Sequence, residues 1–303
     1  MRYRIECIPN ISTADEMLLQ SLSQVIESVP EVDLRFVDPG KGANRTVFTY
    51  LGPAMAVFQA TKLLFEFAQQ HIDMRSHQGV HPRMGAVDVC PFVLLDDKRY
   101  ETEFLQDVER FALEISQDLK VALYGYEKLA KSAAYRNLAA VRKGEYEGLS
   151  ARFAQGDLPD FGPQQWDTHV AMFGATAIGV RELMVAYNVN LAGLPNDQLL
   201  PISKKIAGRI RERDGGMPGV KSIGWYLPDF DMVQVSCNLT KPEAAGVCEV
   251  FERVQELARE YGCEAPSSEL IGCIPRSQFT THSPEQLGFG TLKPFNDKRI
   301  LPL

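Results

Sequence analysis

The sequence predicts an α+β fold made of two halves that share one order of elements. Apolar residues at strand or helix spacing follow the order strand, helix, strand, strand, helix, strand, once before residue 175 and once after it. This is the split β-α-β order of ferredoxin-like sheets. The 303 residues suit two domains of about 150 each. Residues 144–174, rich in Gly, Pro, Asp and Gln, are typical of a linker, so we place the domains at 1–175 and 176–303.

The first half begins with an alternating strand over residues 3–8 that stops at Pro9-Asn10, and a helix over 13–27 follows the caps Ser12 and Thr13. The helix that Pro53 opens has a buried stripe at helical spacing, formed by Val57, Ala60, Leu64 and Ala68. The other elements expected in this half are a hairpin of strands 32–37 and 45–51, a strand at 85–95, a helix at 102–119 and a strand at 121–124.

The second half repeats the pattern but not the residues. We expect a strand at 185–191, a helix at 198–213, a hairpin within 220–239 and a last strand at 269–274. Between the hairpin and the last strand lies an apolar helical stripe, formed by Val247, Val250, Phe251, Val254 and Leu257.

Composition limits the partners. The net charge of -7 leaves no sequence-wide positive field, so nucleic acid is not an expected partner, although a local cluster of Arg and Lys can bind an anionic small molecule. The N-terminus meets charge within two residues and no apolar run is long enough for a membrane span, which predicts a cytoplasmic protein without membrane contact. The six cysteines lie far apart, so we expect them reduced and mostly buried.

The densest polar segment is residues 73–88, a loop between a helix and a strand that holds His77 and His81. Their spacing is that of a zinc pair on a helix, but Gly79 and Pro82 break any helix there, so no metal is expected. Imidazole titrates near neutral pH, which favours general acid/base catalysis by one of these histidines. The alternative is that both only hydrogen-bond the backbone.

A second loop, residues 40–46, is glycine-rich and carries Lys41 and Arg45. It lacks the spacing of a Walker loop and leads into a strand, so nucleotide binding is not expected. It is either a plain hairpin turn or an anion clamp.

Several segments then resemble one family, the glutamate formimidoyltransferases. They are Glu6-Cys7-Ile8-Pro9-Asn10, Asn44-Arg45-Thr46-Val47, His77-Gln78-Gly79 with His81-Pro82-Arg83-Met84-Gly85-Ala86-Val87-Asp88, and Ile223-Gly224-Trp225-Tyr226-Leu227. The resemblance spans nearly the whole chain. It implies two subdomains whose sheets face each other with helices outside and a tunnel between. It also implies transfer of a formimidoyl group between N-formimidoyl-L-glutamate and N5 of tetrahydrofolate, with tetrahydrofolate as co-substrate, in histidine degradation.

The resemblance also implies site residues. The family's catalytic histidine, directly before Pro-Arg-Met-Gly, falls on His81. The family's folate-binding segment maps to Gly162, Pro163, Gln164, Gln165, Trp166, Asp167, Thr168, His169, Val170, Ala171, Met172, Phe173 and Gly174.

The chemistry of the implied reaction adds further residues. Because the amidinium and the tetrahedral intermediate are cationic, a carboxylate should stabilise them, and Asp38 at a strand end is our expected second catalytic residue. Substrate carboxylates call for the fork of a guanidinium, for which we expect Arg45 and Arg83.

The chain departs from the family pattern in two places. Ile11-Ser12-Thr13-Ala14 stands where relatives have Phe-Ser-Glu-Gly, and residues 164–169 lengthen the folate segment. The alternatives are therefore an enzyme of the same fold that acts on formimidoylglycine or on an N-formyl amino acid, or a catalytically silent relative that binds folate. The length leaves no room for the helical cyclodeaminase domain of some relatives, so a separate cyclodeaminase is expected downstream, and a homodimer is compatible with the sequence.

Overall fold

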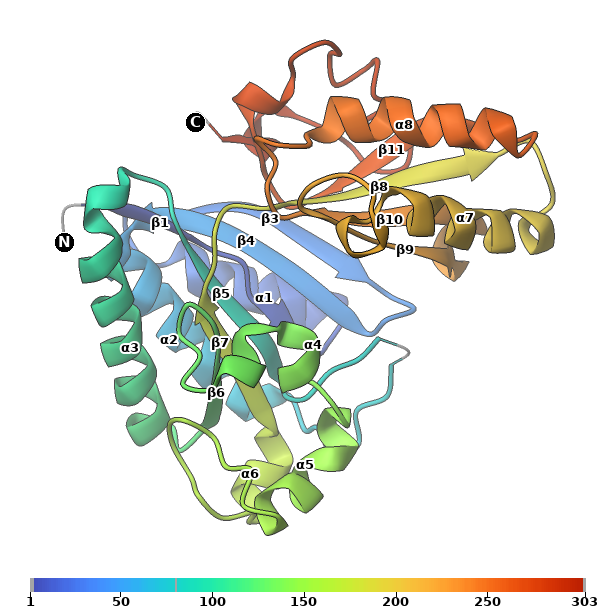
Figure 1. Ribbon diagram of the computed structural model, residues 1–303. Helices are drawn as coiled ribbons and strands as arrows, with labels where there is room; N and C mark the ends of the chain where they lie inside the picture. The colour runs from blue at the N-terminus through green and yellow to red at the C-terminus, as the bar shows by residue number, and fades with distance from the viewer. Residues whose placement is uncertain (1–2, 80, 302–303) are drawn as a thin grey trace. The chain divides into compact units, whose positions relative to one another are not determined.

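The computed structural model describes residues 3–79 and 81–301. The chain divides into two compact units, Met1–Glu182 and Leu183–Leu303, and each is described by itself. Both units combine a β-sheet with helices, so the predicted α+β class is confirmed (Figure 1).

The first unit is built on a seven-stranded sheet. Its strands are β1 (Arg4–Cys7), β2 (Asn10–Ile11), β3 (Asp33–Gly40), β4 (Arg45–Pro53), β5 (Val87–Leu94), β6 (Ala122–Glu127) and β7 (Ala175–Val180). Successive segments β1 and β2 both lie between β4 and β5, antiparallel to each, while β3 pairs with the outer side of β4. On the other side of β5, β7 runs parallel to both β5 and β6.

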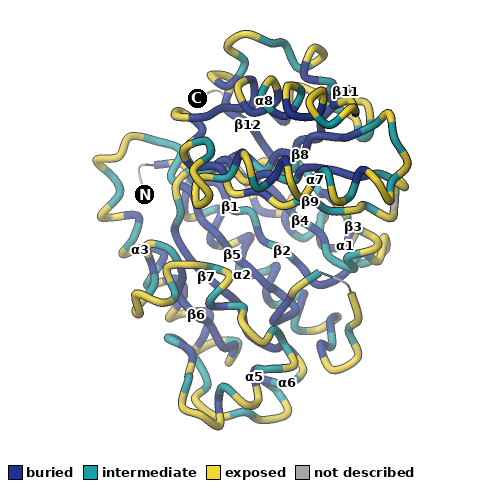
Figure 2. Tube along the Cα trace, turned by 45° about the vertical axis from the view of Figure 1, so that its right-hand side comes forward, coloured by how far each residue is buried: buried dark blue, intermediate teal, exposed yellow. Residues whose placement is uncertain are grey.

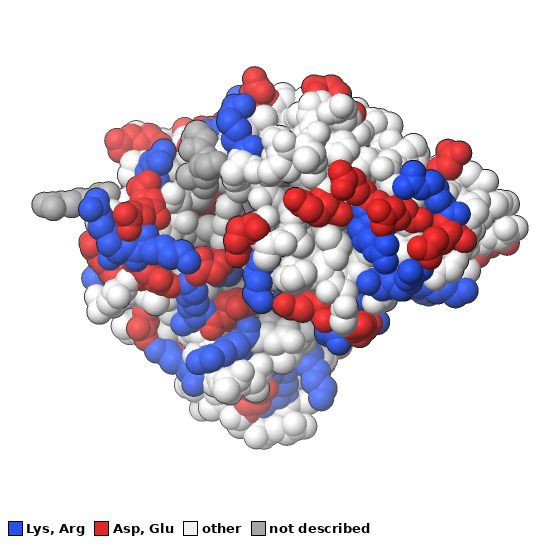
Figure 3. All heavy atoms as spheres, turned by 45° about the horizontal axis from the view of Figure 1, so that its top comes forward, with Lys and Arg blue, Asp and Glu red and all other residues white. Residues whose placement is uncertain are grey.

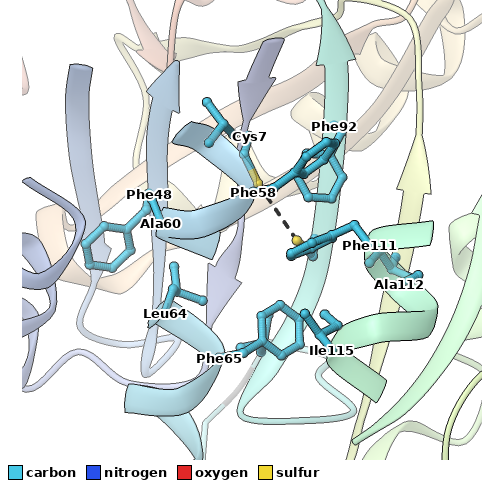
Figure 4. Close-up of a cluster of buried hydrophobic side chains, with 14 of the residues drawn as sticks. Cys7, Phe48, Phe58, Ala60, Leu64, Phe65, Phe92, Phe111, Ala112 and Ile115 are labelled. Carbon is cyan, nitrogen blue, oxygen red and sulfur yellow. Dashed lines mark hydrogen bonds between the residues drawn. The ribbon is translucent and has the colours of Figure 1, made fainter. Parts of the chain in front are cut away.

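Three helices cover one face of this sheet: α1 (Glu16–Glu27), α2 (Ala54–His71) and α3 (Glu101–Asp118). The predicted stripe of α2 is confirmed, since its four residues are fully buried in the core between helices and sheet. Figure 4 shows aromatic rings from two helices and a strand meeting there, with Phe58 stacked on Phe111 at 4.9 Å between ring centroids. Each such side chain contributes about 1.5–3 kcal/mol through burial. In the same core the sulfur atoms of Cys7 and Cys90 are 3.8 Å apart.

The cap predicted for the first helix is wrong. Asp15 is the N-cap of α1, and its carboxylate accepts a hydrogen bond from the backbone N–H of Leu18 at 2.9 Å. The hydroxyl of Ser12 instead donates to the carbonyl of Gly85 at 2.7 Å, in the loop that precedes β5. Ser12 therefore ties the start of the chain to that loop.

The prediction that residues 144–174 form a linker is also wrong, because this stretch, which we placed inside the first domain, is a folded part of it. They contain α5 (Glu145–Ala154) and α6 (Thr168–Phe173), which follow the short helix α4 (Leu138–Val141). Leu149, Phe153 and Val170 from this stretch are buried against β6 and β7 in a second, smaller core on the sheet face opposite α1, α2 and α3. Burial of these apolar side chains holds the segment against the sheet.

The first unit ends seven residues later than the boundary that we placed after residue 175. The residues from Ala175 to Val180 form β7, which pairs with β5 and with β6. The apolar sequence of β7 suits a strand with neighbours on both sides, since every residue in it is buried.

The second unit has a four-stranded antiparallel sheet in the order β11-β8-β10-β9. Its elements are β8 (Val185–Ala192), α7 (Asn196–Ile210), β9 (Val220–Leu227), β10 (Met232–Leu239), α8 (Val247–Glu260) and β11 (Glu264–Ile271). The predicted stripe of α8 is confirmed, because all five of its residues are buried in the core of this unit. The short strands β12 (Ile274–Pro275) and β13 (Ile300–Leu301) form a separate parallel pair.

Burial and charge follow the layering. The strands of both sheets are mostly buried, while exposed residues gather in loops and on the outer sides of helices (Figure 2). The prediction that the six cysteines are buried is confirmed, and all six are free thiols. Basic and acidic side chains are intermixed on the face that Figure 3 shows. Within the described residues, no helix is both long and apolar enough to cross a membrane.

Candidate active site

The loop between α2 and β5 carries both histidines of interest and is fastened to the end of the expected folate segment. Met74 N–H donates to the Met172 carbonyl at 2.8 Å, and Ala86 N–H donates to the Phe173 carbonyl at 2.7 Å. Gly174 follows, with φ of 78°, and a Cβ there would lie 2.3 Å from the carbonyl oxygen of Met84. Only glycine allows this approach of two backbones.

A β-bulge at the start of β5 sets the position of Asp88. Ile11 of β2 is opposite Val87, whereas the preceding Asn10 is opposite Val89, so Asp88 is an extra residue in β5. Bulges redirect side chains and are frequent beside active sites. The Asp88 carboxylate is fully buried, and its Oδ1 accepts the backbone N–H of Met84 at 2.9 Å.

Two guanidinium groups share the other oxygen of this carboxylate. Asp88 Oδ2 lies 2.5 Å from a terminal nitrogen of Arg45 in β4 and 2.8 Å from one of Arg142, which follows α4. The Arg45 side chain is 9% exposed and that of Arg142 is 13% exposed, so solvent screens these pairs little. Burial lowers the pKa of Arg45 to about 10, with Arg142 adding to the shift and Asp88 opposing it. Arg45, Arg142 and Asp88 together therefore carry a net charge of one positive unit.

His81 lies against this charged group. Its Nδ1 is 2.9 Å from a terminal nitrogen of Arg45, 3.5 Å from one of Arg142 and 2.8 Å from the Pro82 carbonyl oxygen. Burial and, next to it, the nearby Arg45 lower the pKa of His81 to about 4, because both disfavour the imidazolium. His81 is accordingly a neutral imidazole at pH 7.

His77 has a different environment in the same loop. Its Nε2 is 3.0 Å from the Asn44 carbonyl, and its Nδ1 accepts from Nε of Arg83 at 3.3 Å. Burial lowers the pKa of His77 as well. Both ring nitrogens of His77 thus have partners within the chain, while for His81 only Nδ1 has a partner among the described residues.

The guanidinium of Arg83 forms a two-point ion pair with Glu147 of α5, at 2.7 and 2.6 Å. Glu145 lies 3.5 Å away. Arg83 is buried, and together with these two carboxylates it lines an open hollow of about 490 Å³ beside His77.

Asp38 lies in β3 on the same face of the sheet as Arg45. It is opposite Val47 of β4, which is in turn opposite Asn10 of β2, while the neighbouring Val37 packs into the core on the other face. Two strand spacings therefore separate Asp38 from Asn10, roughly 10 Å between backbones. Asn10 accepts a hydrogen bond from Nε of Arg45 at 3.2 Å, so this row of residues leads from Asp38 to the charged group.

The expected folate segment has a buried and an exposed side. Trp166 packs edge-on against Phe153, and His169 Nε2 lies 3.0 Å from the Leu119 carbonyl oxygen. These two contacts anchor the segment to the first unit. Asp167 caps α6 through the backbone N–H of Val170. The exposed side chains are those of Gln164, Gln165, Asp167, Thr168 and Met172.

Two residues of the site, Arg142 and Glu147, were not predicted from the sequence. Both lie in the stretch that we assigned to the linker and its approach, more than fifty residues from the side chains they contact. A single sequence carries no signal for such pairing. Within the described residues, no group of three or more His, Cys, Asp or Glu side chains is placed to hold a metal ion.

Comparison with protein families places both units in one class, the formiminotransferase domains. The N-terminal subdomain of the formiminotransferase domain matches residues 4–181, and a further formiminotransferase domain model matches residues 186–284. The chain belongs to the formiminotransferase family, which confirms the resemblance seen in its motifs.

Relatives of two lengths match. A glutamate formimidoyltransferase of Streptococcus pyogenes serotype M1 is 36% identical, with 89% of each chain covered, and one of Thermoplasma acidophilum is 35% identical, with 89% of this chain and 88% of the relative covered. A formimidoyltransferase-cyclodeaminase of Dictyostelium discoideum is 35% identical over 91% of this chain. The chain spans about half the length of the formimidoyltransferase-cyclodeaminases that it matches.

Proposed function

We propose that the protein transfers a formimidoyl group from N-formimidoyl-L-glutamate to N5 of tetrahydrofolate, giving 5-formimidoyltetrahydrofolate and L-glutamate, a step of histidine degradation. The observation that carries this proposal is the neutral, half-buried His81 in the most specific family motif. Relatives named glutamate formimidoyltransferase, matched over nearly their full length, support it.

In this proposal His81 moves the proton of the reaction. In the course of the transfer N5 must lose a proton, and the departing nitrogen of glutamate must gain one. An imidazole whose Nε2 has no partner among the described residues can serve both transfers, and such catalysis contributes about 10² to 10⁴ in rate. The low pKa of His81 keeps it in the neutral form over the physiological pH range.

The other site residues have roles that follow from charge. Asp38 would stabilise the cationic amidinium and intermediate from its place on the same sheet face. The net positive charge of Arg45, Arg142 and Asp88 favours a substrate carboxylate near Arg45. At Arg83 a substrate carboxylate would replace Glu147, which holds the same fork now.

Tetrahydrofolate would bind along residues 162–174 as co-substrate. Two features support this: the exposed Gln164, Gln165 and Met172 on an anchored segment, and the hydrogen bonds that join Met172 and Phe173 to the histidine loop. The strand orders β5-(β1, β2)-β4-β3 and β11-β8-β10-β9, antiparallel throughout, support a ferredoxin-like core in each unit, extended in the first by β7 and β6.

The test is a donor competition. The protein is mixed with tetrahydrofolate and equal amounts of formimidoylglutamate, formimidoylglycine and N-formylglutamate, and both the loss of each donor and the released amino acids are measured. The proposal expects glutamate from formimidoylglutamate to dominate. Preferred use of formimidoylglycine or of N-formylglutamate would show that the proposed substrate is wrong. Tight folate binding in calorimetry, without turnover of any donor, would indicate a catalytically silent relative.

A further inference from the structure

The hydrogen bonds at Nδ1 of His81 determine where the ring carries its proton. A guanidinium nitrogen can only donate, so Arg45, at 2.9 Å, requires a lone pair on Nδ1. The Pro82 carbonyl, at 2.8 Å from the same atom, can only accept and would favour a proton there. The two neighbours therefore favour opposite tautomers.

The partners of the Pro82 carbonyl decide between the tautomers. This oxygen accepts from Arg142, and the terminal nitrogen of Arg45 that faces His81 also lies 2.9 Å from it. That nitrogen carries two protons and lies 2.5 Å from Asp88 Oδ2, which takes one of them, so Pro82 and Nδ1 compete for the other. Because Arg142 already supplies Pro82, the remaining Arg45 proton is available to Nδ1, which is then the acceptor.

We propose that Arg142 is a positioning residue that, with Arg45, holds His81 in the tautomer with its proton on Nε2, so that the neutral imidazole enters the reaction as a proton donor. The role of the tautomer in catalysis rests on the proposed function, whereas the tautomer itself does not. Arg142 acts through Pro82 and Asp88 and does not touch the reacting atoms.

The placement of Arg142 fits this role. One terminal nitrogen of its guanidinium makes all the contacts, to Asp88 at 2.8 Å, to His81 Nδ1 at 3.5 Å and to the Pro82 carbonyl. Its Nε is buried with no hydrogen-bond partner among the described residues. An unpaired buried donor costs about 1–3 kcal/mol, so stability alone does not account for this arrangement.

The charges around the ring agree with a neutral donor. Arg45 comes from β4, Asp88 from β5 and Arg142 from the end of α4, and they sum to one positive charge beside the ring. Burial lowers the pKa of His81, and this charge adds to the effect because it disfavours the imidazolium. The same two cations would stabilise negative charge on the ring as the Nε2 proton leaves.

The resulting proton path balances. N5 forms its bond to the amidine carbon and keeps its proton in the tetrahedral intermediate. As the bond between the amidine carbon and the glutamate nitrogen breaks, the proton on Nε2 moves to that nitrogen. The proton released from N5 then replaces it on Nε2. No proton is gained or lost overall, and His81 returns to its starting tautomer.

Nitrogen NMR of protein labelled with ¹⁵N-histidine tests the tautomer without substrate. The His81 signal is assigned by its absence in His81→Asn. We expect an unprotonated Nδ1 and a protonated Nε2 at pH 7 in the wild type. In Arg142→Met the Pro82 carbonyl loses a donor, so a fraction with the proton on Nδ1 appears and the pKa of His81 rises toward its usual value of 6.5. Arg142→Lys, which keeps the charge, should retain the wild-type tautomer.

The control is Arg75→Met, which removes an exposed arginine of the same loop whose ion-pair partner among the described residues is Asp73, and it should leave the His81 signals unchanged. A protonated Nδ1 in the wild type would overturn the proposal even if no Arg142 variant folds. Unchanged His81 signals in folded Arg142→Met would also overturn it. Turnover separates this proposal from the proposed function. In Arg142→Met, kcat should fall about tenfold while the KM for tetrahydrofolate is retained. A wild-type protein without turnover would contradict the proposed function and leave the tautomer proposal standing.

Discussion

The substitution Asp88→Asn should cost the protein more stability than any other single charge removal at this site. The change keeps the shape of the side chain but removes the one negative charge between Arg45 and Arg142, whose side chains are 9% and 13% exposed. Breaking a buried ion pair by removing one partner costs about 3–5 kcal/mol, because the remaining charge stays buried without compensation. For a unit of this size each kcal/mol lowers the Tm by about 2–4 °C, so a fall of roughly 6–20 °C is expected.

The measurement is urea and thermal unfolding followed by far-UV circular dichroism at pH 7. The matched control is Asp73→Asn, which breaks the exposed pair with Arg75 and should cost no more than about 1 kcal/mol. In the double variant with Arg142→Met, one of the two uncompensated cations is gone. The double variant should therefore be more stable than the sum of the two single losses predicts. A loss for Asp88→Asn no larger than that of Asp73→Asn would refute the role assigned to this carboxylate.

Three further predictions concern other residues of the first unit. Burial raises the pKa of Glu6 from 4.5 to about 7, so the stability that Glu6 contributes is present below pH 4.5 and is lost as the pH rises through 7. Urea unfolding from pH 4.5 to 8 should show that the free energy of unfolding falls by up to ~3 kcal/mol and that Glu6→Gln abolishes this fall. The same dependence of unfolding free energy on pH in both proteins would contradict this prediction. His81→Ala should lower kcat by at least ~10² while calorimetry shows folate affinity largely kept, and a near-normal rate would place the proton transfer elsewhere. Gly174→Ala forces a Cβ to 2.3 Å from Met84 and should destabilise the protein by several times the ~1 kcal/mol expected for Gly156→Ala, which also has a positive φ but open space around it. Equal losses in thermal unfolding would argue against the close approach.

Periodicity was enough to predict the elements with a strong one-sided apolar pattern. The stripes of α2 and α8 and the hairpin of β3 and β4 lie where the sequence places them. The strand that we predicted at 269–274 is β11, which starts at Glu264, five residues before the predicted start. Its first residues include Ser267 and Ser268, which are buried because their hydroxyls form hydrogen bonds within the unit, and an apolar pattern does not reveal them.

The linker was misread for a related physical reason. Gly, Pro and Asp in residues 144–174 make turns and caps, as Gly144 and Asp167 do at the starts of α5 and α6. These residue types also mark connections between domains. The few apolar residues that hold the segment in place, such as Leu149 and Phe153, are too sparse to predict a helix from sequence.

The candidate site was predictable only in its local part. The motif around His81 identified the loop and its histidine, and the structure places Arg45 and Asp88 beside it. The contributions of Arg142 and Glu147 depend on pairing over more than fifty residues of chain, which one sequence cannot show. The predicted catalytic role of Asp38 and the predicted binding of substrate carboxylates by Arg45 and Arg83 stay predictions.

The most direct test of the central claim traces the transferred carbon. Formimidoylglutamate labelled with ¹³C in the formimidoyl group is incubated with tetrahydrofolate and either the wild-type protein or His81→Ala, and the carbon is followed by NMR. We predict that the wild-type protein moves the label to N5 of tetrahydrofolate with one glutamate released per label, and that His81→Ala does so at least ~10² more slowly. A label that stays on the donor with the wild-type protein, or moves equally fast with His81→Ala, would contradict the account.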